Sequence, residues 1–207
     1  MTDESLKPSE TAVVAGETAV VARETAVVVI DMLNDFVTGA LKCDRAQMII
    51  PKIKALVEAA RTAGAHVVYS NDAHSAQDHE LKVAWDAHAM AGTKGAQVIA
   101  ELAPVGGDHV SPKTTYSAFF DTDLDEFLKS KGITTLVLTG LHTDCCVRHT
   151  AADAFFRGYR VVVPDDCVQA FTEEAHTAGL EYLKFWYKAE TPSTAELVGA
   201  LRKEEEE

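Results

Sequence analysis

Two adjacent cysteines stand where an activated nucleophile is expected. Residues 133–138 form an apolar run typical of a buried strand, and residues 139–150 continue as TGLHTDCCVRHT into a predicted helix. A cysteine in the first turn of a helix lies beside free N–H groups and the positive end of the helix dipole, both of which lower its pKa. Cys145 and Cys146 point about 100° apart around such a helix. Spacing alone does not decide between them or exclude a buried structural thiol, and we take Cys146 as the working assignment.

Two charged residues follow other predicted strands. Asp31 ends the apolar run 25–30, and Lys113 follows a short predicted strand at 108–112. A partly desolvated carboxylate suits a general base, and a cation beside it stabilises a thiolate. Either residue alone also fits a plainer role, Asp31 as a turn cap and Lys113 as a solvated surface charge. Together with Cys146 they predict a nucleophile, a base and an orienting cation.

A segment rich in histidine predicts a metal site. Asp72 and His74 are two residues apart, so they point to the same side of an extended chain. With His88 they form a set of N and O ligands that suits Zn²⁺, Mn²⁺ or Fe²⁺. His79 and Glu80 are weaker candidates for a further ligand. The plainer alternative is a polar surface loop.

The elements around these residues alternate between helix and strand. This order predicts an α/β fold, a three-layer α/β/α sandwich with a mostly parallel, Rossmann-like central sheet, whose site lies at the carboxyl ends of the strands. After the strand at 25–30, apolar periodicity predicts strands at 65–70, 108–112, 134–138, 159–163 and 188–191, and helices at 46–63, 95–102, 122–130, 143–157, 172–187 and 194–203.

The chain has the size of one domain. Of its 207 residues, we expect 24–203 to form a single hydrolase domain, 1–23 a flexible extension and 204–207 an acidic tail. The sequence ETAVV recurs at residues 10, 17 and 24, and only the third copy leads into Asp31. A net charge of −13 argues against nucleic acid and anionic membranes as partners. Four cysteines without a secretory leader favour free thiols and a cytoplasmic location.

Three motifs carry a resemblance that covers about residues 25–190. They are DMLNDF from Asp31, KTTYSAF from Lys113, and GLHTDCCV from Gly140. In these the chain resembles the isochorismatase-like cysteine hydrolases, within them the nicotinamidase/pyrazinamidase-related group. The resemblance favours Cys146 over Cys145 and implies a Cys146, Asp31 and Lys113 triad. It also implies a non-proline cis peptide at Leu141–His142 and an oxyanion hole formed by the N–H groups of His142 and Cys146.

The resemblance further implies a divalent metal, most often zinc, on Asp72, His74 and His88 that binds the pyridine nitrogen of the substrate. We also expect substrate contacts from Phe36, Trp85, Tyr116 and His142, although Phe36 and Trp85 could equally be plain core, and the resemblance implies a homo-oligomeric assembly. The chain departs from the group at His142, where a small residue is usual, at Leu33, where Gln is usual, and at Ala73, where Trp is usual. These departures affect the substrate pocket.

The expected function is therefore hydrolysis of a small amide by a nicotinamidase-like cysteine hydrolase. Isochorismatase-type ether hydrolysis and cleavage of a carbamoyl or ureido amide are alternatives in the same superfamily. A hydrolase that uses metal-activated water, with incidental cysteines, and a non-catalytic scaffold are alternatives from other classes.

Overall fold

The structure, a computed structural model, describes residues 20–203. The first copy of the ETAVV repeat, most of the second and the acidic tail at 204–207 lie outside the described residues. Val20 and Ala22 are buried in the core at 3% and 5% exposure. The packed part of the chain therefore begins before residue 24, the boundary that the sequence suggested.

One parallel sheet forms the centre of the fold. Its strands are β1 (Thr25–Ile30), β2 (His66–Asp72), β3 (His109–Lys113), β4 (Thr135–Leu141), β5 (Arg160–Val162) and β6 (Val168–Gln169). The order is β3-β2-β1-β4-β5, and β6 pairs with the end of β4. Strands β1 and β4 are buried along their whole length, as expected for parallel strands covered on both faces.

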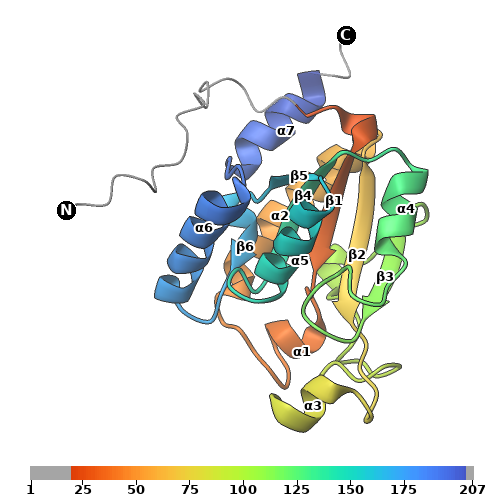
Figure 1. Ribbon diagram of the computed structural model, residues 1–207, viewed down its shortest axis with the longest axis vertical. Helices are drawn as coiled ribbons and strands as arrows, with labels where there is room; N and C mark the ends of the chain where they lie inside the picture. Colours follow the sequence, from red (N-terminus) through yellow and green to blue (C-terminus); the bar gives the residue numbers. More distant parts are fainter. Residues whose placement is uncertain (1–19, 204–207) are drawn as a thin grey trace, which may run out of the picture.

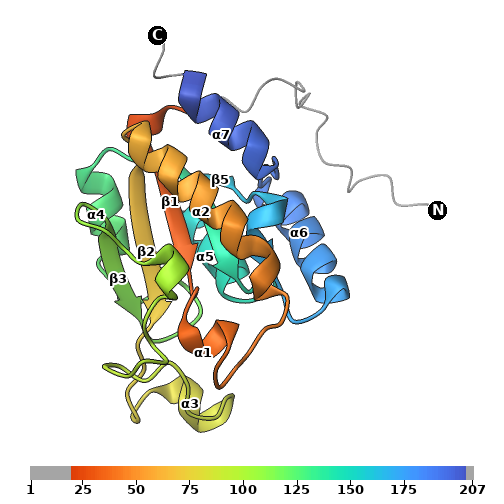
Figure 2. The same cartoon turned by 180° about the vertical axis from the view of Figure 1, so that it is seen from behind.

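Helices cover both faces of the sheet, so the predicted three-layer sandwich is confirmed. Val27 and Val29 of β1 pack in one cluster with α2 (Ala46–Thr62) and α7 (Thr194–Lys203). Ala26, Val28 and Ile30 face the other cluster, which includes α4 (Leu124–Ser130), α5 (Cys146–Phe156) and α6 (Glu173–Tyr187). Helices α5 and α6 lie in front of the sheet in Figure 1, and α2 lies in front in Figure 2.

Two predicted elements were wrong. Residues 95–102 form only the short 3-10 helix η2 (Ala100–Leu102), because the backbone of residues 95–99 bonds to the loop after β1 instead of to itself. The N–H groups of Asn34 and Asp35 donate to the carbonyls of Gln97 and Gly95. Residues 188–191 form no strand, since only Glu190 makes a bridge, to Val162.

Four further short elements precede or connect the strands. They are α1 (Asn34–Val37), α3 (His79–Val83), η1 (Ala22–Glu24) before β1, and η3 (Asp165–Cys167) before β6. Figure 1 shows α1 and α3 below the carboxyl ends of β1 and β2. Among the described residues, no helix is both long and apolar enough to cross a membrane.

Candidate active site

A buried network of charges joins the ends of three neighbouring strands. Lys113, at the end of β3, is 1% exposed, and its Nζ lies 2.8 Å from Oδ2 of Asp31 at the end of β1. The same ammonium bonds to Oδ1 of Asp72 at the end of β2. The parallel register places Asp72 directly beside Lys113. The structure thus brings together two residues of the predicted triad and one predicted metal ligand.

Hydrogen bonds to β2 hold Asp31 in place. The residue has a φ of 53°, which turns the chain sharply after β1. Its N–H donates to Oδ1 of Asn71 at 3.0 Å, and its Oδ1 accepts the N–H of Asp72 at 2.8 Å. Oδ2 pairs with the ammonium of Lys113 at 2.8 Å and accepts no hydrogen bond from any other group within residues 20–203. A lone pair is therefore available for a proton.

The charges in this network set its protonation. Burial and the negative charge of Asp72 raise the pKa of Asp31 to about 7, against the opposing effect of Lys113. Burial disfavours the Lys113 ammonium, but Asp31 and Asp72 outweigh it and hold the pKa of Lys113 well above its usual value. For Asp72, Lys113 and His74 more than offset burial, so its pKa is lowered. The arrangement supplies a base that takes up and releases a proton near neutral pH.

A tight turn places Cys146 at the end of β4. The peptide bond between Leu141 and His142 is cis, as the resemblance implied. Gly140 has a φ of 99°, and a Cβ atom on it would lie 1.9 Å from the carbonyl oxygen of Ile30. Only glycine fits a strand that approaches β1 so closely.

The turn leaves two backbone donors free beside the thiol. The carbonyl of His142 accepts the N–H groups of Cys145 and Val147. Within the part of the chain that the structure describes, the N–H groups of His142 and Cys146 have no acceptor. Free N–H groups beside a nucleophile are the elements of an oxyanion hole.

The two cysteines differ in their surroundings. Cys146 is 5% exposed, and the hydrogen bond with Cys145 together with burial raises the pKa of its thiol, against the effect of Lys113. Cys145 is half-buried, and its hydrogen bonds with Cys146 and His149 lower its pKa to about 6 in spite of burial. The pKa values alone would favour Cys145 as the thiolate. The charges of both Asp31 and Lys113 act on the Cys146 thiol, and a general base activates a neutral thiol, so this pairing favours Cys146.

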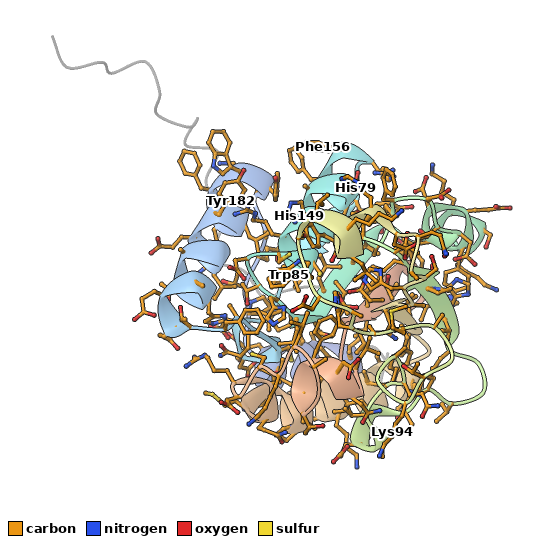
Figure 3. All side chains as sticks on the ribbon, turned by 90° about the horizontal axis from the view of Figure 1, so that it is seen from below. His79, Trp85, Lys94, His149, Phe156 and Tyr182 are labelled. Carbon is orange, nitrogen blue, oxygen red and sulfur yellow. The ribbon has the colours of Figure 1, made fainter. Side chains whose placement is uncertain are left out.

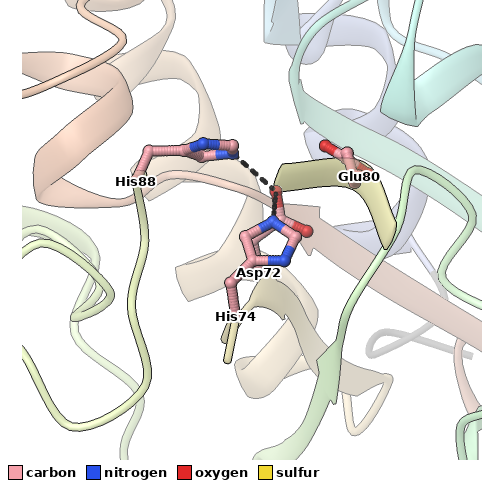
Figure 4. A group of neighbouring side chains, drawn as sticks. All are labelled: Asp72, His74, Glu80 and His88. Carbon is pink, nitrogen blue, oxygen red and sulfur yellow. Dashed lines mark ion pairs between the residues drawn. The ribbon is translucent and has the colours of Figure 1, made fainter. Parts of the chain in front are cut away.

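A group of potential metal ligands adjoins the charge network. Ligand atoms of Asp72, His74, Glu80 and His88 all lie within 4.8 Å of one another, and all four residues are buried (Figure 4). Nε2 of His74 and Oε2 of Glu80 have no hydrogen-bond partner among the described residues. This donor set fits a divalent cation such as zinc. His79 is exposed on α3 and outside the group, so its proposed ligand role is not supported, and Glu80 takes that place.

Contacts behind the two histidines orient their rings toward the group. Nδ1 of His74 lies 3.1 Å from Oδ2 of Asp78, and Nδ1 of His88 lies 2.8 Å from the carbonyl of Asp86. Nε2 of both rings faces Oδ2 of Asp72, at 3.6 Å and 3.9 Å. Such outer contacts are typical of metal-binding histidines.

A cavity of about 290 Å³ connects the thiols with the potential metal ligands. Figure 3, which looks onto this edge of the sheet, shows Trp85 near the middle of the face. The Trp85 Nε1–H donates to the hydroxyl of Tyr116 at 3.1 Å. The lining residues are Phe36, Leu41, Asp72, Glu80, Trp85, His88, Tyr116, His142, Asp144, Cys145, Cys146 and Phe171.

The cavity includes residues that the sequence did not indicate. Phe171 stacks on His142 with ring centroids 4.1 Å apart, and Asp144 adds a carboxylate. Phe171 follows the two-residue strand β6, which is too short for a periodic signal. The predicted contact residues Phe36, Trp85, Tyr116 and His142 all line the cavity.

The sequence profile of the family described as "Isochorismatase domain" matches residues 25–197. Among solved structures, the N-carbamoylsarcosine amidase of Thermoplasma acidophilum has a TM-score of 0.78 at 40% identity, covering 83% of this chain and 96% of that chain. Nicotinamidase PncA of Bacillus subtilis has a TM-score of 0.78 at 34% identity, covering 82% and 99%. The pyrazinamidase of Pyrococcus horikoshii, solved in complex with zinc, has a TM-score of 0.76 at 28% identity, covering 82% and 99%. The chain therefore belongs to the isochorismatase-like cysteine hydrolase superfamily.

Proposed function

We propose that the protein hydrolyses a small carboxamide in the manner of a nicotinamidase, through a thioester on Cys146. One observation carries the proposal: the buried Asp31–Lys113–Asp72 network lies beside a four-residue donor group, and one cavity reaches both that group and Cys146. A base, a cation, a thiol and a ligand-binding group at one sheet edge are the parts that amide hydrolysis requires.

In the proposed reaction, Oδ2 of Asp31 accepts the proton of the Cys146 thiol as sulfur attacks the amide carbonyl. The N–H groups of His142 and Cys146 donate to the oxyanion of the tetrahedral intermediate. Asp31 returns the proton to the departing nitrogen, which leaves as ammonia. Asp31 then takes a proton from water, whose oxygen attacks the thioester and releases the carboxylic acid and the thiol.

Lys113 acts through position and charge. Its ammonium stays between two carboxylates and keeps one of them ionised while the other exchanges a proton. A pKa of about 7 for Asp31 suits a group that must be base and acid in one cycle.

Asp72, His74, Glu80 and His88 would hold a divalent metal, with zinc the first choice. The unpartnered Nε2 of His74 and Oε2 of Glu80 support this assignment. The ion would supply an electrophilic contact for a substrate heteroatom such as a pyridine nitrogen. Phe36, Trp85, Tyr116 and His142 would hold the body of the substrate.

A second candidate is cleavage of a carbamoyl or ureido amide. The 40% identity to an N-carbamoylsarcosine amidase supports it, and the same thiol chemistry applies to a carbamoyl carbonyl. The two candidates differ in the part of the substrate that does not react.

Ammonia release from nicotinamide, pyrazinamide and N-carbamoyl compounds tests both candidates. We expect turnover of at least one amide, loss of about 10⁴-fold or more in Cys146→Ala, and retention of most activity in Cys145→Ala. The reverse result would reassign the nucleophile. Full activity in the double variant would favour a hydrolase using metal-activated water, and no turnover of any compound would favour a scaffold.

A further inference from the structure

The charged side chains that line the cavity are all acidic. Asp72, Glu80 and Asp144 contribute carboxylates, and the lining includes no lysine or arginine. Lys113 lies behind the wall at 1% exposure and already contacts two carboxylates. Among the residues that line the cavity, no lysine or arginine is therefore available to pair with a substrate carboxylate.

Two imidazoles line the cavity; His88 belongs to the donor group, and His142 does not supply positive charge. Burial lowers the pKa of His142 to about 4, although Asp144 and Asp72 oppose this effect. The ring stacks on Phe171 and meets Phe36 edge-on, with centroids 6.0 Å apart. At neutral pH, His142 is thus a neutral imidazole within an aromatic wall.

A divalent ion on the donor group would offset the charges of Asp72 and Glu80 but leave that of Asp144. Asp144 is half-buried and takes part in no ion pair within residues 20–203. It directly precedes the two cysteines, so its charge acts at the end of the cavity where the acyl group reacts.

We infer that this cavity selects amides whose non-reacting part is uncharged and discriminates against ligands that carry a carboxylate, including the acid released by hydrolysis. The inference rests on the proposed function in taking this cavity as the substrate site. Because a carboxylate would enter beside Asp144 with no lysine or arginine in the lining to pair with it, the cost of its desolvation is not offset by a side-chain cation. Acid substrates such as N-carbamoyl amino acids are disfavoured, and the product acid is expelled.

Two pairs of ligands with matched shapes test the inference. Nicotinamide and nicotinate form one pair, and N-carbamoylglycinamide and N-carbamoylglycine the other. Calorimetric titration of the Cys146→Ala variant measures binding without turnover, once with one equivalent of zinc and once after chelation. We expect each neutral ligand to bind at least about tenfold more tightly than its acid, as one nearby unit charge at intermediate dielectric produces.

A charge-neutral replacement identifies the residue responsible. For each pair, the ratio compares the dissociation constant of the acid with that of the neutral ligand. In Asp144→Asn, on the Cys146→Ala background, this ratio should fall about tenfold. Glu181→Gln removes the same charge from the exposed face of α6 and should leave the ratio as it was. Because salt screens the charge of Asp144, raising the salt concentration should lower this ratio in the Cys146→Ala protein. The ratio should change much less in the protein that also carries Asp144→Asn.

Three results would overturn the inference. They are equal binding of acid and amide, tighter binding of the acid when zinc is present, and failure of both neutral ligands to bind. The proposed function is judged separately, by ammonia release from the wild-type protein. A protein that binds the neutral ligands selectively but releases no ammonia would retain the inference and refute the amidase.

Discussion

Replacement of Lys113 by methionine tests whether the charge network holds the site together. Methionine keeps the length of the side chain but removes the ammonium between Asp31 and Asp72. Two buried carboxylates would then face each other without a cation. The variant should therefore either lose free energy of unfolding or hold a proton on one of the two carboxylates. Both effects can be measured.

The distance gives the size of the effect. At 2.8 Å between Nζ and Oδ2 of Asp31, the attraction is roughly 6 kcal/mol with an effective dielectric constant of about 20. Relaxation and water entry reduce this to about 3–5 kcal/mol, the usual cost of removing one partner of a buried pair. The loss should grow between about pH 5 and pH 8, because a carboxylate whose pKa is raised by folding destabilises the fold once it ionises.

Denaturant unfolding followed by tryptophan fluorescence measures the loss of stability at pH 5 and pH 8. The pH profile of kcat/KM gives the second readout, and its acid limb should move up by about two pH units as the pKa of Asp31 rises. Lys129→Met removes a cation from an exposed pair with Asp125 and should cost about 0.5 kcal/mol or less. A loss below about 1 kcal/mol in Lys113→Met with an unshifted profile would refute the assigned role of Lys113.

Three further outcomes are expected. Below about pH 7, kcat/KM of the wild type should fall about tenfold per pH unit as Asp31 becomes protonated, and a flat profile down to pH 5 would exclude it as the base. Mass spectrometry of the native protein should find about one zinc per chain. The zinc should be lost in His88→Ala and kept in His79→Ala, because His79 is exposed and lies outside the donor group. Equal zinc content in the two variants would place the metal elsewhere. Gly140→Ala should cost about 3 kcal/mol or more by thermal unfolding, because its Cβ meets the carbonyl of Ile30. Gly132→Ala has open space and should cost only about 1–2 kcal/mol, so equal losses would contradict the steric argument.

The sequence predicted the fold, and a site at the carboxyl ends of the strands, for one reason. Buried parallel strands appear as continuous apolar runs, and their carboxyl ends must share one edge of the sheet. Strands β1, β2 and β3 pair side by side in parallel, so the residues at their carboxyl ends lie next to one another. The cis bond at Leu141–His142 came from the resemblance and not from local propensity.

Features that depend on loops were not predictable in this way. Glu80 and His79 are adjacent, and only the short helix α3 decides which of them turns inward. Residues 95–99 have helical spacing but bond to the loop after β1, a tertiary contact that overrides propensity. Phe171 enters the cavity from a segment with no periodicity.

Strand β1 is the third copy of the ETAVV repeat, and this duplication creates competitors for the central place in the sheet. If the chain slipped by seven residues, Arg23 would occupy the position of Ile30, which is 0% exposed. A slip by fourteen would place Gly16 there and leave a cavity where the isoleucine packs. Burying an unpaired guanidinium or losing a core isoleucine each costs several kcal/mol, on the order of 2–5 for the latter. One apolar residue at the end of the repeat thus selects the register that puts Asp31 in the site.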